Sequence, residues 1–188
     1  MSTKYPGNII SLGGPESNSN YFNGSSSQYL SIASNAVFGF GTGDFTIEFW
    51  INYRTLTGYQ TPISKGYTAA GDLLFQTGNG DGKIIVYISG TAVITESVGA
   101  VVGNWYHYAL VRSGTTVTLY RNGTSVGTAT SAVNFNTTNQ LGIGATGKAP
   151  GGGAIGDYAI NGTMSNVRIV KGVAVYTGSF TPPTAPLA

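Results

Sequence analysis

The chain has 188 residues, of which only 9% are charged, and its formal net charge is +2. Cysteine is absent, which excludes disulfides and thiolate metal sites. The Lys and Arg residues are scattered singly between Lys4 and Lys171, so there is no basic patch to predict nucleic acid as a partner.

The N-terminal segment, residues 1–20, precedes the first predicted strand and is expected to form an arm. It lacks the apolar stretch of a secretory signal, and no run in the chain is apolar enough to predict a membrane span. We therefore expect synthesis in the cytoplasm without a signal peptide and no membrane contact. The length predicts a single domain over residues 1–188, with its core at about 21–187.

Twelve short apolar or alternating segments follow the arm, separated by turns rich in Gly, Asn, Ser and Thr. None shows helical periodicity, and no strand–helix–strand pattern occurs. Many short strands at this spacing predict an all-β fold, an antiparallel β-sandwich of two sheets. The predicted strands are Tyr21–Phe22, Tyr29–Ser31, Phe45–Tyr53, Thr61–Lys65, Leu73–Gln76, Lys83–Ile88, Ala92–Thr95, Trp105–Ser113, Thr116–Arg121, Thr124–Ala129, Gln140–Ile143 and Gly162–Val170.

Two of the long predicted strands show which residues share a face. Phe45–Tyr53 alternates strictly, with one apolar face and a mixed face that holds Glu48 and Trp50. Trp105–Ser113 is apolar on both faces, which predicts a central strand covered on both sides. The residues expected to form the core or its boundary are Phe45, Ile47, Phe49 and Trp105.

The later part of the chain adds a hairpin, a long loop and a proline-rich end. Asn122-Gly123 predicts a type I′ turn, because both residues tolerate positive φ. The glycine-rich segment 142–156 predicts a long loop rather than a linker, since the strand after it must return to the same sheet. Residues 181–186 predict an extended, polyproline-like tail.

Four segments, in this order, resemble a laminin G-like jelly roll of the concanavalin A-like lectin/glucanase superfamily. They are Gly41–Ile51 (GTGDFTIEFWI), Pro62–Gly66 (PISKG), Trp105–Thr124 (WYHYALVRSGTTVTLYRNGT) and Asn166–Leu187. The resemblance covers roughly Tyr21–Leu187, and its closing segment is most similar to versions found in virion proteins of tailed bacteriophages. It implies the fold but not an activity, because the fold hosts sugar binders, hydrolases and structural modules.

Some relatives on this fold cleave β-glucans with a Glu-x-Asp-x-x-Glu strand motif. Here only Asp44 and Glu48 are available, and Thr46 stands between them. Residues four apart on a strand are separated by roughly 13 Å, whereas glycosidase carboxyl groups lie about 5–5.5 or 6.5–9.5 Å apart. The sequence therefore predicts a non-enzymatic protein in which Glu48 is a structural, hydrogen-bonded residue.

The single histidine, His107, gives no evidence of a nucleophile triad. It lies in the middle of a predicted strand, and the chain has no Gly-x-Ser-x-Gly elbow. We therefore interpret His107 as a packing residue whose ring nitrogens are satisfied.

Many laminin G-like domains bind calcium through loop carboxylates and backbone carbonyls. The loop acids here are Asp72, Asp81 and Asp157, each beside a glycine and none in an Asp-x-Asp array. A composite Ca²⁺ site stays open, with ordinary turn aspartates as the alternative. No other cofactor is expected.

Aromatic loop residues suggest a glycan-binding platform. Glycan binders stack rings on sugar faces, and Tyr53, Tyr59, Tyr67 and Tyr158 lie in or near predicted loops. The alternative is that these tyrosines pack on neighbouring side chains or at a subunit interface.

The resemblance and the composition together predict a non-enzymatic phage virion protein, either a capsid decoration or cement protein or a peripheral tail or fibre component. Its partners would be other virion proteins and further copies of itself, with a trimer expected by analogy with capsid symmetry. Loop 147–159 and tail 181–188 are expected to lie against a neighbouring subunit. The alternative function is a carbohydrate-binding adhesin that recognises host surface glycans.

Overall fold

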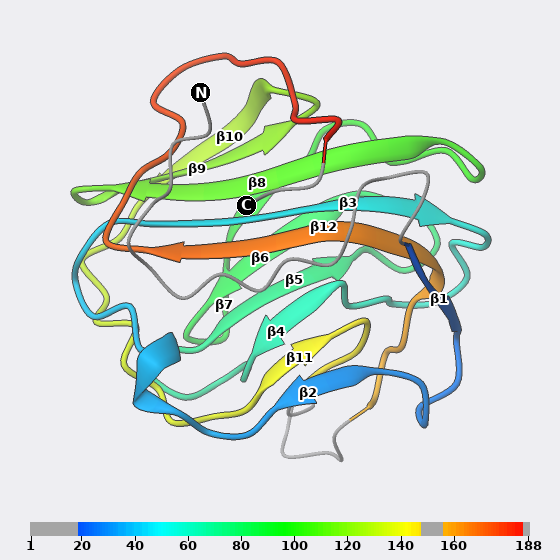
Figure 1. The fold of residues 1–188 in the computed structure, drawn as a ribbon, viewed down its shortest axis with the longest axis horizontal. Coiled ribbons are helices and arrows are strands. Elements are labelled where there is room, and N and C mark those ends of the chain that lie inside the picture. The colour runs from blue at the N-terminus through cyan, green and yellow to red at the C-terminus, as the bar shows by residue number, and fades with distance from the viewer. Residues whose placement is uncertain (1–18, 148–155, 186–188) are drawn as a thin grey trace.

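The computed structural model describes residues 19–147 and 156–185, and these form two antiparallel sheets packed face to face (Figure 1). The first sheet contains, in spatial order, β1 (Asn20–Asn23), β12 (Asn161–Lys171), β3 (Phe45–Tyr53), β8 (Trp105–Ser113), β9 (Thr116–Arg121) and β10 (Thr124–Thr130). The second contains β2 (Leu30–Ile32), β11 (Leu141–Ile143), β4 (Ile63–Lys65), β5 (Leu73–Thr77), β6 (Ile84–Ile88) and β7 (Thr91–Thr95).

This architecture confirms the predicted all-β jelly-roll sandwich and its strands. The largest difference in a strand end is at β4, which begins at Ile63 rather than Thr61. A short 3₁₀ turn, η1 (Ala36–Phe38), was not predicted, and the Oδ1 atom of Asn35 caps it by accepting the Val37 amide. Asn122 and Gly123 both have positive φ, as the predicted turn requires.

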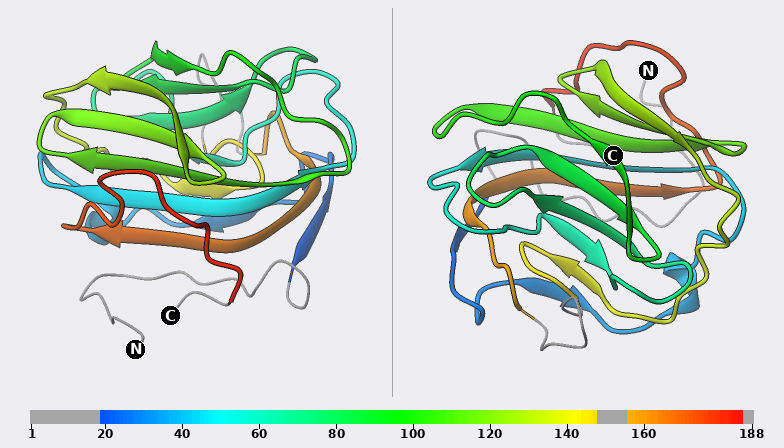
Figure 2. Two further views of the ribbon diagram at one scale, coloured as in Figure 1. Left: turned by 90° about the horizontal axis from the view of Figure 1, so that it is seen from above. Right: turned by 180° about the vertical axis from the view of Figure 1, so that it is seen from behind.

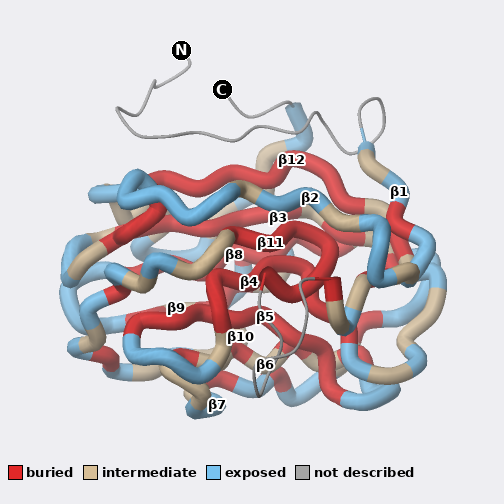
Figure 3. The backbone as a smooth tube through the Cα atoms, turned by 90° about the horizontal axis from the view of Figure 1, so that it is seen from below, coloured by how far each residue is buried: buried red, intermediate tan, exposed pale blue. Residues whose placement is uncertain are grey.

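The core lies between the two sheets and contains the apolar face of β3. Phe45, Ile47 and Phe49 are buried, and the Phe49 ring meets Phe75 of the second sheet edge to face at 5.5 Å. Figure 3 shows the buried stretches along β12, β11 and β4, with most exposed residues in the loops. Trp105 was also expected in the core, but it is half-buried and shares the outer face of β8 with His107. Alternation along β8 instead directs Tyr106, Tyr108 and Leu110 into the core.

The outer face of the first sheet is covered by residues 172–185, which we call the C-terminal strap. In the left view of Figure 2 the strap, in red, runs along the outside of this sheet. Tyr176 and Phe180 of the strap pack on a small apolar cluster that includes Ala109 and Tyr120. This contact confirms that β8 is covered on both sides.

The strap gives the tail a partner within its own chain. Residues 181–185 were expected against a neighbouring subunit, which stays a prediction, and the Trp50 Nε1 atom donates to the Pro183 carbonyl at 2.9 Å within the same chain. Residues 1–18 of the predicted arm, residues 148–155 of the glycine-rich loop and residues 186–188 of the tail lie outside the described residues. In the two described ranges, no helix is long and apolar enough to cross a membrane.

Candidate functional site

The tyrosines predicted to form a glycan platform separate into three places. Tyr53 belongs to the core, where its side chain is fully buried, so it is not part of any surface. It is the last residue on the apolar face of β3, and burial followed by the charges of Tyr108 and Glu96 raises the pKa of its hydroxyl. The prediction was wrong for Tyr53 because the alternation of β3 continues to its end.

Tyr59 and Tyr158 form an exposed pair. Their side chains come from different loops and meet edge to face, with ring centroids 5.9 Å apart. Tyr59 is 44% exposed and Tyr158 is 38% exposed. Tyr158 has a φ of 53°, which is a strained backbone conformation for a bulky side chain, and such strain is concentrated at functional sites.

Tyr67 meets a tyrosine that the sequence did not single out. Tyr87 of β6 contacts Tyr67 edge to face at 5.3 Å, and both residues are half-buried. Burial, followed by the charges of Tyr67 and Tyr59, raises the pKa of the Tyr87 hydroxyl. Tyr87 could have been found from the alternation of β6, which buries Val86 and Ile88 and turns Tyr87 outward. We call Tyr59, Tyr67, Tyr87 and Tyr158 the tyrosine face.

Buried hydrogen bonds fix the loops that carry this face. Gln60, next to Tyr59, donates from Nε2 to the Thr55 carbonyl and accepts the Asn161 amide at Oε1, each at 2.8 Å. The Thr61 amide donates to the Tyr158 carbonyl at 2.8 Å. The loop before β4 and the turn before β12 are therefore joined, and the exposed ring pair is held in place before any ligand arrives.

The aspartates predicted as calcium ligands serve other purposes. Asp72 accepts the Tyr67 and Ala69 amides at Oδ2, each at 2.8 Å, and the Asn139 side-chain amide at Oδ1 at 2.7 Å. It therefore shapes the turn that carries Tyr67. Asp81 accepts the Lys83 amide in the β5–β6 turn.

These contacts do not fit a calcium site. Asp72 precedes β5 and Asp81 follows it, so the two carboxylates lie at opposite ends of that strand. Asp157 accepts both hydrogen bonds from Thr146 with its backbone carbonyl. Among the described residues, no group of three or more His, Asp or Glu side chains could hold a metal ion, whereas calcium takes about six to eight oxygen ligands.

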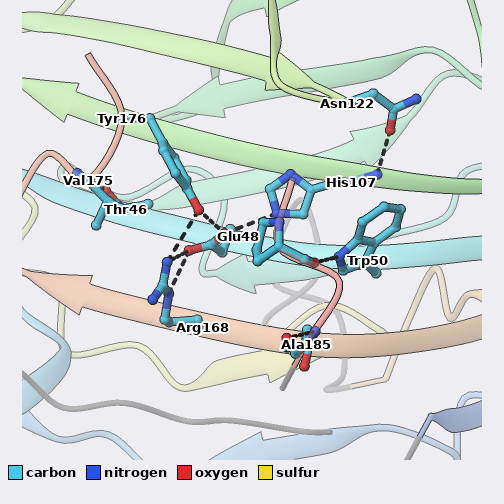
Figure 4. Close-up of polar contacts among 11 residues, drawn as sticks. Thr46, Glu48, Trp50, His107, Asn122, Arg168, Val175, Tyr176 and Ala185 are labelled. Atoms are coloured by element: carbon cyan, nitrogen blue, oxygen red, sulfur yellow. Dashed lines mark hydrogen bonds and ion pairs between the residues drawn. The ribbon is translucent and has the colours of Figure 1, made fainter. Parts of the chain in front are cut away.

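Glu48 lies at the centre of a buried polar network on the outer face of the first sheet (Figure 4). Its Oε1 atom accepts from Arg168 Nε at 2.6 Å, and its Oε2 atom lies 3.0 Å from His107 Nε2 and accepts from the Tyr176 hydroxyl at 2.9 Å. Burial acts to raise the pKa of Glu48, but the His107 hydrogen bond, the Arg168 charge and the Tyr176 hydroxyl together lower it.

His107 belongs to this network, whereas Asp44 has a separate partner. His107 packs between the rings of Trp50 and Phe180, and in the described part of the chain its Nδ1 atom has no hydrogen-bond partner. It is thus a packing histidine with only one nitrogen satisfied. Asp44 accepts the Gly114 amide at 2.8 Å. Each candidate carboxylate is bound to its own structural partners.

The strap is attached directly above this network. The Thr46 hydroxyl donates to the Val173 carbonyl and accepts the Val175 amide, and Asn166 Nδ2 donates to the Ala185 carbonyl at 3.1 Å. The strap therefore covers part of the outer face of the first sheet, and the exposed pair of Tyr59 and Tyr158 lies in loops outside the strap.

Comparisons with solved structures agree with this fold. A candidate carbohydrate-binding protein from Bacteroides ovatus ATCC 8483 is 17% identical with a TM-score of 0.62, and the match covers 92% of this chain but only 45% of that protein. Domain 4 of AbnA, a GH43 extracellular arabinanase from Geobacillus stearothermophilus solved with arabinotriose, is 17% identical with a TM-score of 0.61, covering 90% and 78%. The heptameric SAP-like pentraxin from Limulus polyphemus is 17% identical with a TM-score of 0.54, covering 92% and 77%.

At these identities the structural matches show the fold alone. A comparison with the sequences of curated proteins finds no match. The family model described as the concanavalin A-like lectin/glucanases superfamily, of laminin G type, matches residues 22–175. This match spans both sheets from β1 to the start of the strap, and the chain therefore belongs to the laminin G-like branch of the concanavalin A-like lectin/glucanases superfamily.

Proposed function

We propose that this protein is a non-enzymatic carbohydrate-binding module that binds glycans on its tyrosine face. The observation that carries the proposal is the exposed pair of Tyr59 and Tyr158, held edge to face by hydrogen-bonded loops. Fixed aromatic rings give a ligand a large apolar contact area, and their hydroxyls supply hydrogen bonds.

The solved structures support this proposal without deciding it. The Bacteroides ovatus protein is named for carbohydrate binding, and the arabinanase domain was solved with a bound trisaccharide. Both share the sandwich but little sequence, so they support the class of ligand and leave its identity to experiment.

Binding to a glycan array, followed by calorimetry with the best ligand, tests the proposal. We expect Tyr59→Ala and Tyr158→Ala each to weaken binding at least about tenfold, because truncating a central aromatic contact typically costs more than about 1 kcal/mol. Tyr59→Phe, which keeps the ring, should retain most of the affinity. Val101→Ala, in an exposed loop, is the control for nonspecific effects. Alanine variants that bind as tightly as the wild type would place the site elsewhere.

We expect no hydrolysis of β-glucans. The Glu48 carboxylate is buried and bonded to Arg168 and Tyr176, so it is neither exposed to a substrate nor paired with Asp44. A reducing-sugar assay at high protein concentration should give the rate of the buffer blank. Release of sugar by the wild type that disappears in Glu48→Gln would show that the protein is an enzyme.

A role in a phage virion is a second proposal. It rests on the resemblance of the segment Asn166–Leu187 to virion proteins and on the low content of charged residues. In this role the protein would sit on the virion surface, as a capsid decoration protein or as part of the tail or fibre, and glycan binding would attach the particle to its host. Immunogold labelling of purified particles tests the location, and unlabelled particles would contradict it.

We also propose self-association, with a trimer as the expected species. A surface with few charges provides little electrostatic repulsion between copies, and the pentraxin of the same fold is heptameric. Light scattering over a range of protein concentrations should give the mass of three chains. A constant monomer mass at the highest concentration would contradict the proposal.

A further inference from the structure

A groove at one edge of the sandwich has no role in the site described so far. It lies along β1 and the loop that leads from β1 to β2, and it holds about 290 Å³ of space. This volume is near the lower end of ligand pockets, which span about 300–1,000 Å³. The groove therefore has room for one small unit of a larger ligand rather than for a whole glycan.

The groove has the chemistry of a neutral sugar site. Its walls include the Tyr21 and Tyr29 rings, and Ser27 and Gln28 add a hydroxyl and an amide. Tyr21 is 51% exposed, and the Arg54 guanidinium lies over its ring at 5.2 Å. The residues that line the groove are themselves uncharged, and the Arg54 guanidinium on the Tyr21 ring adds one charge beside them. Aromatic contact and hydrogen bonds would do the binding.

The loop that forms one wall of the groove is fixed by its own hydrogen bonds. The Asn23 amide donates to Gln28 Oε1 at 3.0 Å, and the Gln28 amide donates to the Ser25 carbonyl at 2.9 Å. The Gly24 amide donates to the Ile160 carbonyl at 2.9 Å, which joins the loop to the chain entering β12. A ligand would therefore meet a preformed wall and cause little loss of conformational entropy on binding.

The groove is also in contact with the turn that carries Tyr158. Gly156 lies against the groove loop, and a Cβ atom at this position would come within 2.1 Å of the Ser26 carbonyl oxygen and 3.0 Å of the Tyr29 ring. Only glycine permits this approach, and its φ of 100° also favours glycine. The groove and the tyrosine face are thus adjacent surfaces that meet at the 156–158 turn.

We propose that this groove is a second subsite, which takes a neutral sugar unit of the same linear oligosaccharide that the tyrosine face binds. The inference rests on the proposed carbohydrate-binding function and extends it: the ligand is a chain of several sugars that crosses the 156–158 turn. Tyr21 and Tyr29 contact one end of this chain, and Tyr59 and Tyr158 contact the other.

Calorimetry with two series of linear probes, arabino-oligosaccharides and cello-oligosaccharides from disaccharide to hexasaccharide, tests the subsite. For the series that binds, we expect wild-type affinity to rise with length until both subsites are filled. Tyr29→Ala should weaken binding of the longest probe about tenfold, the loss typical of an aromatic contact, and change disaccharide binding less than twofold. Ser27→Trp, which fills the groove without removing an aromatic wall, should have the same length-dependent effect.

The outcomes separate the inference from the function on which it rests. If Tyr29→Ala and Ser27→Trp bind the longest probe as tightly as the wild type while Tyr59→Ala does not, the subsite is refuted and the proposed function stands. If the wild type binds neither probe series nor any array glycan, both are refuted. Thermal unfolding of each variant, compared with the wild type, shows whether a loss of binding is a loss of folding; in that case Ser27→Trp decides.

Discussion

Replacing Glu48 with alanine is expected to lower the free energy of unfolding by about 3–5 kcal/mol, the loss typical when one partner of a buried ion pair is removed. The carboxylate accepts hydrogen bonds from Arg168 and Tyr176 at a site where Glu48 is fully buried. Its removal leaves the buried guanidinium facing an apolar side chain and releases one of the contacts that hold the strap. Urea denaturation followed by tryptophan fluorescence measures the loss.

Two variants make this measurement specific. Asp44→Ala removes a nearby carboxylate that accepts only one amide hydrogen bond, from Gly114. This substitution should lower the free energy of unfolding by only about 1 kcal/mol. Combining Glu48→Gln with Arg168→Met should restore part of the stability, because uncharged residues of similar volume often replace a buried ion pair without loss. If Glu48→Ala unfolds at the same urea concentration as the wild type, the network does not stabilise the fold.

The pH dependence of stability follows from the same carboxylate. The folded protein holds the pKa of Glu48 below its ordinary value of 4.5. The unfolded chain therefore binds the proton more tightly, and the contribution of Glu48 is complete above pH 4.5 and lost as the pH falls through the folded pKa. The difference in stability between wild type and Glu48→Gln should shrink over this acid range. A difference that is constant with pH would contradict the assignment.

Phe49→Ala is expected to be equally damaging, with a loss of about 3–5 kcal/mol. Phe49 is fully buried, and its ring meets Phe75 of the second sheet at 5.5 Å and Tyr108 of β8 at 5.8 Å. Its removal opens a cavity between the sheets that rigid strands close only in part. We expect a lower urea midpoint and little soluble protein on expression at 37 °C.

Tyr59→Ala is the matched control for Phe49→Ala, because it also removes an aromatic ring but from an exposed position. Surface substitutions usually change stability by less than about 0.5 kcal/mol. Trp105→Ala should lie between the two, because Trp105 is half-buried on the outer face of β8. If Phe49→Ala unfolds at the same urea concentration as Tyr59→Ala, the assignment of Phe49 to the core is wrong.

The sequence by itself determined the strands and the faces of two long ones, β3 and β8. Alternation along Phe45–Tyr53 and Trp105–Ser113 is local information, because successive side chains of a strand point to opposite faces whatever the strand pairs with. It therefore predicted the burial of Phe49 and the covered position of β8. The same rule, applied to the end of β3, would have removed Tyr53 from the predicted platform. Applied to β6, it would have added Tyr87 to the platform.

The tertiary structure decided which distant residues meet. Glu48 binds His107, Arg168 and Tyr176, which follow it by 59, 120 and 128 residues. Such partners depend on the order of strands in the sheet and on the path of the strap, and local alternation contains neither. For the same reason, the contact between Tyr59 and Tyr158, and the position of Gly156 against the groove loop, appear only when the loops of both sheets are brought together.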